Sequence, residues 1–410
     1  MGEEQLATQT ERRTRAGRFV VQHSGPDGYA AFIPESLPPN PPVEFGAELR
    51  HASEDAAHAL GRLDGVSALM DPDRLLYIYV RKEAVLSSQI EGTQSTLSDL
   101  LTYENEQAPG TPVTDVLEVS HYVAALQHAA ESIQSGRMPL TLRLLRETHA
   151  VLMRNGRGAR QAAGEFRRTQ NWIGGSRPGN AKFVPPPPHE MQLALDNFEK
   201  YLHDAYGRTP PILKAGIAHA QFETIHPFLD GNGRMGRLLI SLLFVADGVL
   251  RRPFFYLSLY LKENRSDYYD ALQRVRTHGD WEGWLRFYLV GVEAVARQAT
   301  HTTQALSTLF REDEARVRLV GRSAGTALRV YDALRRRVIV STTRLTHDLE
   351  LTWPAIQHAM ERLGALGIAN EITGRARGRM YAYARQLELL NRGVNGEAED
   401  TVEPLPPDRA

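Results

Sequence analysis

The feature that most constrains the fold is the segment 226–237, His-Pro-Phe-Leu-Asp-Gly-Asn-Gly-Arg-Met-Gly-Arg, together with its flanks. Residues 215–224 before it have a helical pattern, and residues 238–246 after it are apolar on all sides. A helix that is apolar all round is buried, as in the middle of a helical bundle. The sequence therefore predicts a tight turn that leads into the N-terminus of a buried helix.

This turn has the chemistry of an anion site. Gly231, Gly233 and Gly236 let the backbone bend sharply and approach a ligand closely. Free backbone N–H groups and the helix dipole favour negative charge at a helix N-terminus. Arg234 and Arg237 lie three residues apart, and guanidinium groups suit phosphate oxygens. We therefore expect the turn to bind phosphate.

The segment resembles the signature of the Fic (filamentation-induced-by-cAMP) family, HxFx[D/E]GNGRxxR, at every specified position. The resemblance implies an all-α fold, a Fic helical bundle with a β-hairpin flap. It also implies a protein adenylyltransferase that moves AMP from ATP to a Ser, Thr or Tyr hydroxyl of a target protein. Doc-type members carry Lys in place of Gly233 and phosphorylate instead, so Gly233 favours attack at the α-phosphate. The motif leaves UTP or another nucleotide open as the donor.

The resemblance also assigns roles to residues. His226 would be the general base that takes the proton of the target hydroxyl. Asp230 would bind Mg²⁺, which a single carboxylate and the nucleotide phosphates can hold. The alternative role for Asp230 is a carboxylate that caps the helix N-terminus. The positions that would bind ATP are Gly231, Asn232, Gly233, Arg234, Met235, Gly236 and Arg237, with the Asn232 amide and neighbouring backbone N–H groups donating to the α-phosphate.

A second motif lies upstream, at Ser87-Ser-Gln-Ile-Glu91-Gly92. It resembles the family's inhibitory-helix motif, [S/T]xxxE[G/N]. The resemblance implies that Glu91 pairs with Arg237, competes with the γ-phosphate of ATP and leaves the α-phosphate misaligned. Ser87, one helical turn before Glu91, would brace its carboxylate.

Two further segments are similar to functional parts of the family. By similarity of residues 256–269, Asn264 and Tyr268 would face adenine or ribose, although an aromatic at helical spacing also suits a core. Residues 164–188 are similar to the flap on which a target protein docks, where an exposed edge can add a strand from the target. A purely structural hairpin is the alternative.

Two rival motifs are rejected. Residues 231–236 fit GxGxxG, but a Rossmann fingerprint must follow a strand, and the preceding segment is helical. His226 and Asp230 have no third ligand nearby in the sequence, which disfavours a transition-metal site.

Patterning along the chain predicts five regions. These are an N-terminal tail with an extended proline-rich segment (1–45), a helical region with the inhibitory helix (46–112), the Fic domain (113–311), a winged-helix domain (321–392) and a disordered tail (393–410). Helices are expected at 48–68, 74–103, 113–134, 142–153, 189–206, 212–224, 235–246, 266–275 and 282–311. Thr141 is an expected N-cap, and the hairpin is the one β element expected before residue 321.

The C-terminal part changes character. Helices at 327–337, 342–348 and 354–366, followed by strands at 368–371 and 380–383, resemble a winged helix-turn-helix. Residues 321–392 contain twelve arginines against six acidic residues, so this part is basic. It would bind DNA through 354–366, or serve dimerisation or target docking; Trp353 and Pro354 at the helix start weaken base recognition.

Composition limits the remaining possibilities. The net charge is −1, cysteine is absent, and the N-terminus lacks an apolar signal segment. We therefore expect a cytoplasmic protein with no membrane partner. Two other functions stay open: removal of AMP from a target, with Glu91 orienting a water, and a DNA-binding regulator whose Fic part senses nucleotide. Self-modification and a homodimer are also compatible with the sequence.

Overall fold

The computed structural model describes residues 13–23, 28–68, 72–106, 113–154, 162–203, 209–321, 324–375 and 378–392. The chain divides into two compact units. The first comprises the residues up to 95 and 111–300; the second comprises 96–110 and the residues from 301 onward. The expected C-terminal tail, 393–410, lies outside the described residues.

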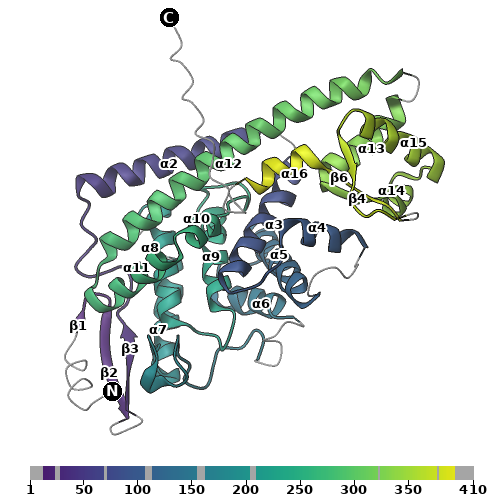
Figure 1. The fold of residues 1–410 in the computed structure, drawn as a ribbon. Coiled ribbons are helices and arrows are strands. Elements are labelled where there is room, and N and C mark those ends of the chain that lie inside the picture. Colours follow the sequence, from purple (N-terminus) through teal and green to yellow (C-terminus); the bar gives the residue numbers. More distant parts are fainter. Residues whose placement is uncertain are drawn as a thin grey trace, which may run out of the picture. The chain divides into compact units, whose positions relative to one another are not determined.

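The first unit is built around two buried helices, α8 (Pro211–Ile225) and α9 (Asn232–Ala246). Every residue of α8 from Ile212 onward is buried, and residues 238–244 of α9 are buried, as the apolar pattern of residues 238–246 predicts. These two helices pack against each other, and α5 (Val113–Gln134) packs on α9 (Figure 1). The segment between α8 and α9 is the predicted turn.

The other helices of this unit surround that pair. They are α2 (Ala47–Ser67), α3 (Pro72–Ile90), α6 (Leu142–Leu152), α7 (Pro188–Leu202), α10 (Ser258–Glu263), α11 (Arg265–His278) and the first part of α12 (Trp281–Arg318). Thr141 caps α6 as predicted, because its hydroxyl accepts the N–H of Leu144 at 3.2 Å. Helix α10 was not predicted.

The prediction of one continuous helix over 74–103 is wrong, because this segment forms two helices. Helix α3 ends at Ile90, and α4 (Leu97–Glu106) begins after a break. Gly92 in this break has φ +97°, a conformation that side-chain-bearing residues rarely adopt. The break also separates the two units, since α4 belongs to the second.

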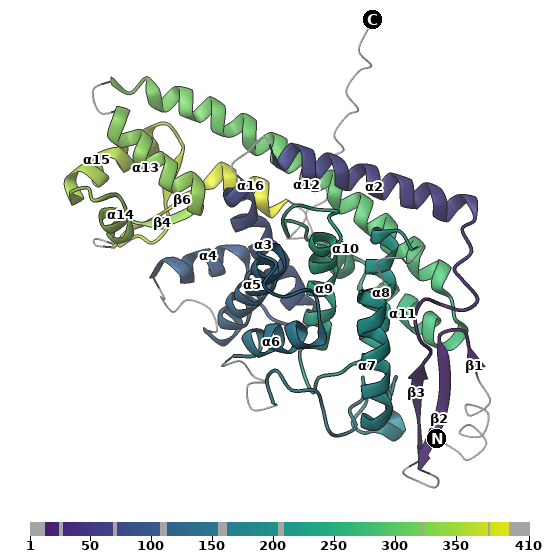
Figure 2. The same cartoon turned by 180° about the vertical axis from the view of Figure 1, so that it is seen from behind.

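An N-terminal sheet corrects the expectation that residues up to 20 form a tail and that the hairpin is the one β element before residue 321. Strands β1 (Arg13–Thr14), β2 (Gly17–His23) and β3 (Tyr29–Pro34) form an antiparallel sheet in the order β1-β2-β3. Figures 1 and 2 show it beside α7, on which β3 packs. The sheet forms because β3 buries an apolar run, and Phe32 packs on Phe19 with ring centroids 5.0 Å apart.

The predicted flap at 164–188 is a hairpin in outline only. A single antiparallel bridge joins Ile173 and Phe183, and the short 3-10 turn η1 (Pro178–Asn180) lies between them. Next to the bridge, the N–H of Phe32 in β3 donates to the carbonyl of Val184 at 2.9 Å. One side of the flap is therefore already paired with the N-terminal sheet.

The second unit has the element order that the sequence predicts, with additions. Its elements are α4, the end of α12, α13 (Ala324–Arg337), β4 (Ile339–Ser341), α14 (Thr342–Leu349), α15 (Trp353–Ala365), β5 (Ala369–Glu371), β6 (Met380–Tyr383) and α16 (Ala384–Asn391). The three strands form an antiparallel sheet in the order β4-β6-β5; β4 and α16 were not predicted. No helix among the described residues of either unit is long and apolar enough to cross a membrane.

Candidate active site

The turn between α8 and α9 begins and ends in left-handed backbone conformations. His226 has φ 49° and ψ 59° and ends α8; Gly231 has φ 77° and precedes α9. A Cβ atom at Gly231 would lie 2.8 Å from the sulfur of Met153, so this position also needs glycine for space. The two left-handed residues reverse the chain within a few positions, which brings the His226 side chain back beside the start of α9.

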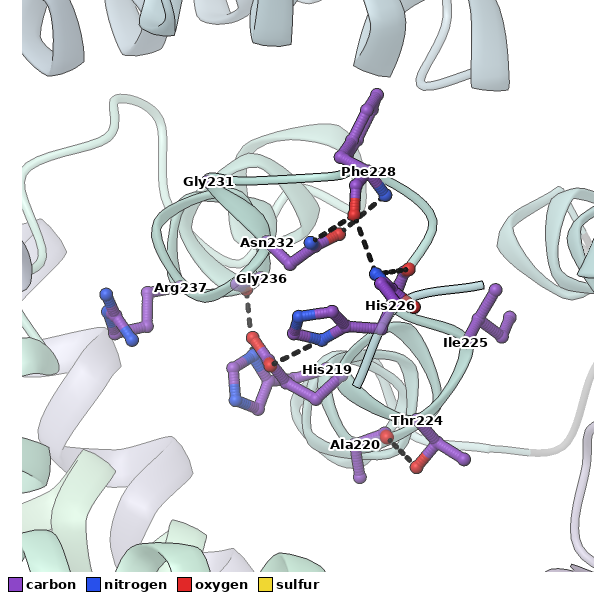
Figure 3. A network of polar contacts seen from close by, with 12 residues as sticks. His219, Ala220, Thr224, Ile225, His226, Phe228, Gly231, Asn232, Gly236 and Arg237 are labelled. Carbon is purple, nitrogen blue, oxygen red and sulfur yellow. Dashed lines mark hydrogen bonds and ion pairs between the residues drawn. The ribbon is translucent and has the colours of Figure 1, made fainter. Parts of the chain in front are cut away.

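The side chain of Asn232 has a different partner from the predicted one. Its amide oxygen accepts the N–H of Phe228 at 2.8 Å, and its amide nitrogen donates to the carbonyl of Phe228 at 2.8 Å (Figure 3). Asn232 thus holds the turn closed. That this amide also donates to an α-phosphate stays a prediction, because an amide nitrogen carries two N–H groups and the bond to Phe228 uses one of them.

Met235 also faces inward. Its side chain is fully buried, and its N–H donates to the carbonyl of Gly231 at 3.0 Å. These contacts anchor Met235 within the turn, and its part in ATP binding stays a prediction.

His149 supports the turn from α6, and sequence reasoning missed it. Its ring stacks on Phe228 at 3.7 Å between centroids. The N–H of Gly164 donates to Nδ1 at 2.9 Å, so Nε2 carries the ring proton and donates to the carbonyl of Asp230 at 3.0 Å. Burial lowers the pKa of His149 to about 4, which keeps this tautomer neutral.

The flap fixes the backbone of His226. Its carbonyl accepts hydrogen bonds from Arg167 Nε at 2.9 Å and from the side-chain amide of Asn171 at 3.2 Å. Burial lowers the pKa of the imidazole to about 3, and the positive charges of Arg276 and Arg167 add to this effect. The ring is therefore neutral at physiological pH and can accept a proton.

Asp230 and Arg234 lie at the other side of the turn. Asp230 Oδ1 accepts the N–H of Gly231 at 2.6 Å and lies 3.8 Å from an Arg234 nitrogen, while the Asp230 side chain is 43% exposed. Arg234 is buried and pairs with Glu118 of α5 at 3.4 Å. Among the described residues there is no group of three or more His, Cys, Asp or Glu that could hold a metal ion. A cation at Asp230 would need further ligands from a nucleotide.

Glu91 reaches the second arginine of the turn. Its Oε1 lies 2.7 Å from Arg237 Nη2. The sequence predicted that Ser87 braces Glu91, but Ser87 contacts Arg237 instead. The Ser87 hydroxyl accepts a hydrogen bond from Arg237 Nε at 2.8 Å, and the Ser87 carbonyl accepts one from Arg237 Nη2 at 2.9 Å. Arg237 is only 2% exposed and Glu91 39% exposed. Burial opposes ionisation of Glu91, but the charge and hydrogen bond of Arg237, together with the charge of Arg234, outweigh burial and lower the pKa of the carboxyl.

The Glu91 carboxylate also covers the beginning of α9. A Cβ atom at Gly233 would lie 2.3 Å from Glu91 Oε1 and 3.0 Å from Arg237 Nη1. A side chain at 233 would therefore collide with this pair. The Glu91 carboxylate therefore lies beside the space that a phosphate would need at this helix N-terminus.

The two expected nucleoside contacts occupy different surroundings. Tyr268 is fully buried, and its hydroxyl donates to Nε2 of His219 at 2.9 Å; His219 Nδ1 donates to the carbonyl of Gly236 at 2.8 Å (Figure 3). Asn264 donates to the carbonyl of Tyr260 at 3.0 Å. That these two residues face a nucleoside stays a prediction. The exposed neighbour Tyr269, which sequence reasoning missed, lies close enough to Glu91 and Arg237 for their charges to act on its hydroxyl.

The geometry defines a glycine-rich helix N-terminus with a neutral histidine and buried arginines, the arrangement of a phosphate-handling site. Residues 50–131 match the Fic/DOC family N-terminal model, and residues 139–244 match the Fic/DOC family model. The chain therefore contains a Fic/DOC family N-terminal domain and a Fic/DOC family domain.

Named relatives and solved structures are also similar to this chain. "Protein adenylyltransferase Fic" of Drosophila grimshawi is 30% identical over 55% of this chain and 44% of its own length, and its Aedes aegypti namesake is 30% identical over 55% and 43%. The chain thus spans less than half the length of these relatives. A Fic family protein from Desulfovibrio desulfuricans G20 has a TM-score of 0.53 at 18% identity, covering 83% of this chain and 97% of that one. Fic-1 from C. elegans has a TM-score of 0.51 at 23% identity, covering 63% and 74%.

Proposed function

We propose that this chain transfers AMP from ATP to a hydroxyl side chain of a protein and that Glu91 restrains the reaction. One observation carries the proposal. Arg237, buried at the N-terminal end of α9, is paired at 2.7 Å with a carboxylate from outside the turn, while the same turn holds a neutral imidazole at His226. The names of the relatives support the transferase activity.

The chemistry uses His226 as the general base. The target oxygen attacks the α-phosphorus, its proton passes to the imidazole, and the bond from the α-phosphorus to the bridging oxygen breaks so that pyrophosphate leaves. Backbone N–H groups at the start of α9 stabilise the charge that develops on the α-phosphate. Arg234 and Arg237 bind the outer phosphates.

Asp230 is the residue that would hold Mg²⁺. Its side chain is partly exposed beside the proposed phosphate site, and Mg²⁺ commonly binds through one carboxylate together with nucleotide phosphates. The bound cation would supply charge neutralisation to the phosphates.

Restraint by Glu91 follows from competition for Arg237. To invert a state from about 99% closed to about 99% open requires roughly 5.5 kcal/mol of differential interaction, whereas an exposed ion pair contributes at most about 1 kcal/mol. Arg237 is buried, but Glu91 is 39% exposed, so the pair lies between these limits. We therefore expect incomplete inhibition and slow self-modification.

The target protein would dock on the flap at 164–188. The stretch from Trp172 to Arg177 is largely exposed, whereas residues 183–187 on the opposite side are buried, so the exposed side is the one that can accept a strand. Trp172→Ala should weaken modification of the target and leave self-modification unchanged. Equal loss of both reactions would remove the docking role.

Incubation of the purified protein with α-labelled ATP and Mg²⁺ tests the proposed activity. The expected result is covalent label on protein, abolished by His226→Ala and retained by Glu199→Gln, a control on α7 whose carboxylate accepts the N–H of Leu142. Label that persists in His226→Ala would rule out the assigned base. Release of AMP from a labelled target, without its addition, would instead support the reverse activity.

A further inference from the structure

We propose that Glu223 is the partner carboxylate of His226: it orients the imidazole and stabilises the imidazolium formed when His226 takes the hydroxyl proton. The proposal rests on the transferase function above. It makes Glu223 a positioning residue, acting on the reaction through His226.

The distances that support it lie within the last turn of α8. Glu223 Oε2 is 3.9 Å from His226 Nδ1, and the two residues are three apart on the helix. Both are shielded, with side chains 8% and 18% exposed. His226 Nδ1 and Glu223 Oε1, the other oxygen of the same carboxylate, are buried atoms without a hydrogen-bond partner among the described residues. The backbone carbonyl of Glu223 also acts on the ring and is a competing acceptor. A small ring movement would close the contact between Nδ1 and the carboxylate.

The start of α9 is shaped to admit this carboxylate. A Cβ atom at Gly236 would lie 2.2 Å from Glu223 Oε1. No residue with a side chain fits at 236 unless Glu223 moves. The glycine that the signature leaves unspecified therefore makes room for the carboxylate of Glu223, next to the helix end that would bind phosphate.

The pKa values of Glu223 and His226 suit a histidine that accepts a proton during the reaction, rather than one that forms a permanent ion pair with Glu223. Burial raises the pKa of Glu223 to about 7, against the opposing effect of Arg237, while the pKa of His226 is lowered to about 3. At rest the ring is neutral, with Nδ1–H directed to Glu223 and Nε2 free to accept. When Nε2 receives the hydroxyl proton, the new positive charge lies beside the carboxylate, which lowers the cost of forming it.

The test uses the released form, Glu91→Gly, so that inhibition does not obscure the rate. In this background Glu223→Gln should lower kcat for labelling by roughly 10- to 100-fold and leave KM for ATP unchanged, because the base is affected and the phosphate site is not. Glu199→Gln is the matched control and should retain the rate.

Each result separates this inference from the proposed function. An inactive Glu91→Gly protein would contradict the function itself. An active Glu91→Gly protein whose rate is unchanged by Glu223→Gln, or lowered through KM alone, would overturn the role of Glu223. Should the Glu223 variant not fold, nitrogen NMR of the His226 ring in the intact Glu91→Gly protein decides: the Nδ1–H tautomer is expected, and the Nε2–H tautomer would overturn the proposal.

Discussion

At the scale of single residues, the signature in the sequence predicts some side chains of the site, whereas others are found only in the folded structure. His226, Arg234 and Arg237 lie at one turn, as their spacing in the sequence predicts. Glu91 reaches Arg237 from a distant segment, which the upstream motif also predicted. His149 could not be predicted, because its contacts with Phe228 and Asp230 depend on how α6 packs rather than on any local pattern.

The ionisation of the site gives a prediction about pH. In the Glu91→Gly protein the labelling rate should fall as pH is lowered below about 7, because Glu223 takes up a proton in this range while His226, with a pKa of about 3, stays neutral. The Glu91 charge helps to raise the pKa of Glu223 to about 7, so its loss in this variant moves the fall toward lower pH. The groups that act on the charge of Glu223 are Glu91, which raises its pKa in the wild-type protein, Arg237 of α9, Arg276 and Tyr268 of α11, and the neighbouring His226.

The measurement is kcat against pH, from about pH 6 to about pH 9. Glu223→Gln should remove the step near pH 7, which separates Glu223 from Glu83, a second buried carboxyl whose pKa burial raises to about 7. A rate that is independent of pH across this range in the Glu91→Gly protein would contradict the prediction.

At the scale of elements, helical periodicity was enough to locate most helices. Helices α5, α8 and α9 fall where their apolar patterns indicate. The sheet β1–β3 was not predicted, because β1 has only two residues and charged residues such as Arg13, Arg15 and Arg18 interrupt the pattern. The break between α3 and α4 was missed because the apolar pattern resumes on the same phase after Gly92.

The segment after Glu91 carries a prediction of its own. The N–H of Gln94 donates to Asp115 Oδ2 of α5 at 2.9 Å, which fixes the backbone that follows Glu91. Asp115→Ala removes this acceptor, a bond of about 1 kcal/mol, and should raise basal self-labelling roughly 3- to 10-fold. The same change in the Glu91→Gly background should have no effect. A similar increase in both backgrounds would show that Asp115 acts by another route.

At the scale of the whole molecule, the chain passes between the two units three times, after residues 95, 110 and 300. The patterning of the sequence groups residues 97–106 with the inhibitory helix, whereas the contacts of α4 group it with the second unit, although α4 follows α3 closely in the sequence. Its attachment is explicit: Asn105 donates to the carbonyl of Ile339 at 2.8 Å, and Arg344 donates to that of Glu104 at 2.7 Å. Such long-range grouping depends on tertiary contacts, which local patterns do not encode.

The second unit gives a prediction about DNA. The exposed start of α15 presents Trp353 and Pro354, side chains that read no base edge by bidentate hydrogen bonds. We therefore expect gel shifts with duplex DNA to be independent of sequence and lost as salt is raised. A sequence-specific complex that survives at about 0.15 M salt would contradict this expectation and favour the regulator alternative.

The most direct test of the account compares self-labelling by the wild-type protein and by Glu91→Gly with α-labelled ATP and Mg²⁺. Because the Glu91 carboxylate binds the guanidinium that the outer phosphate requires, the account predicts slow labelling of the wild type and a rate at least about 10-fold higher in Glu91→Gly. Labelling at equal rates in the two proteins, with His226→Ala inactive in both backgrounds, would leave the transferase standing and contradict the restraint by Glu91.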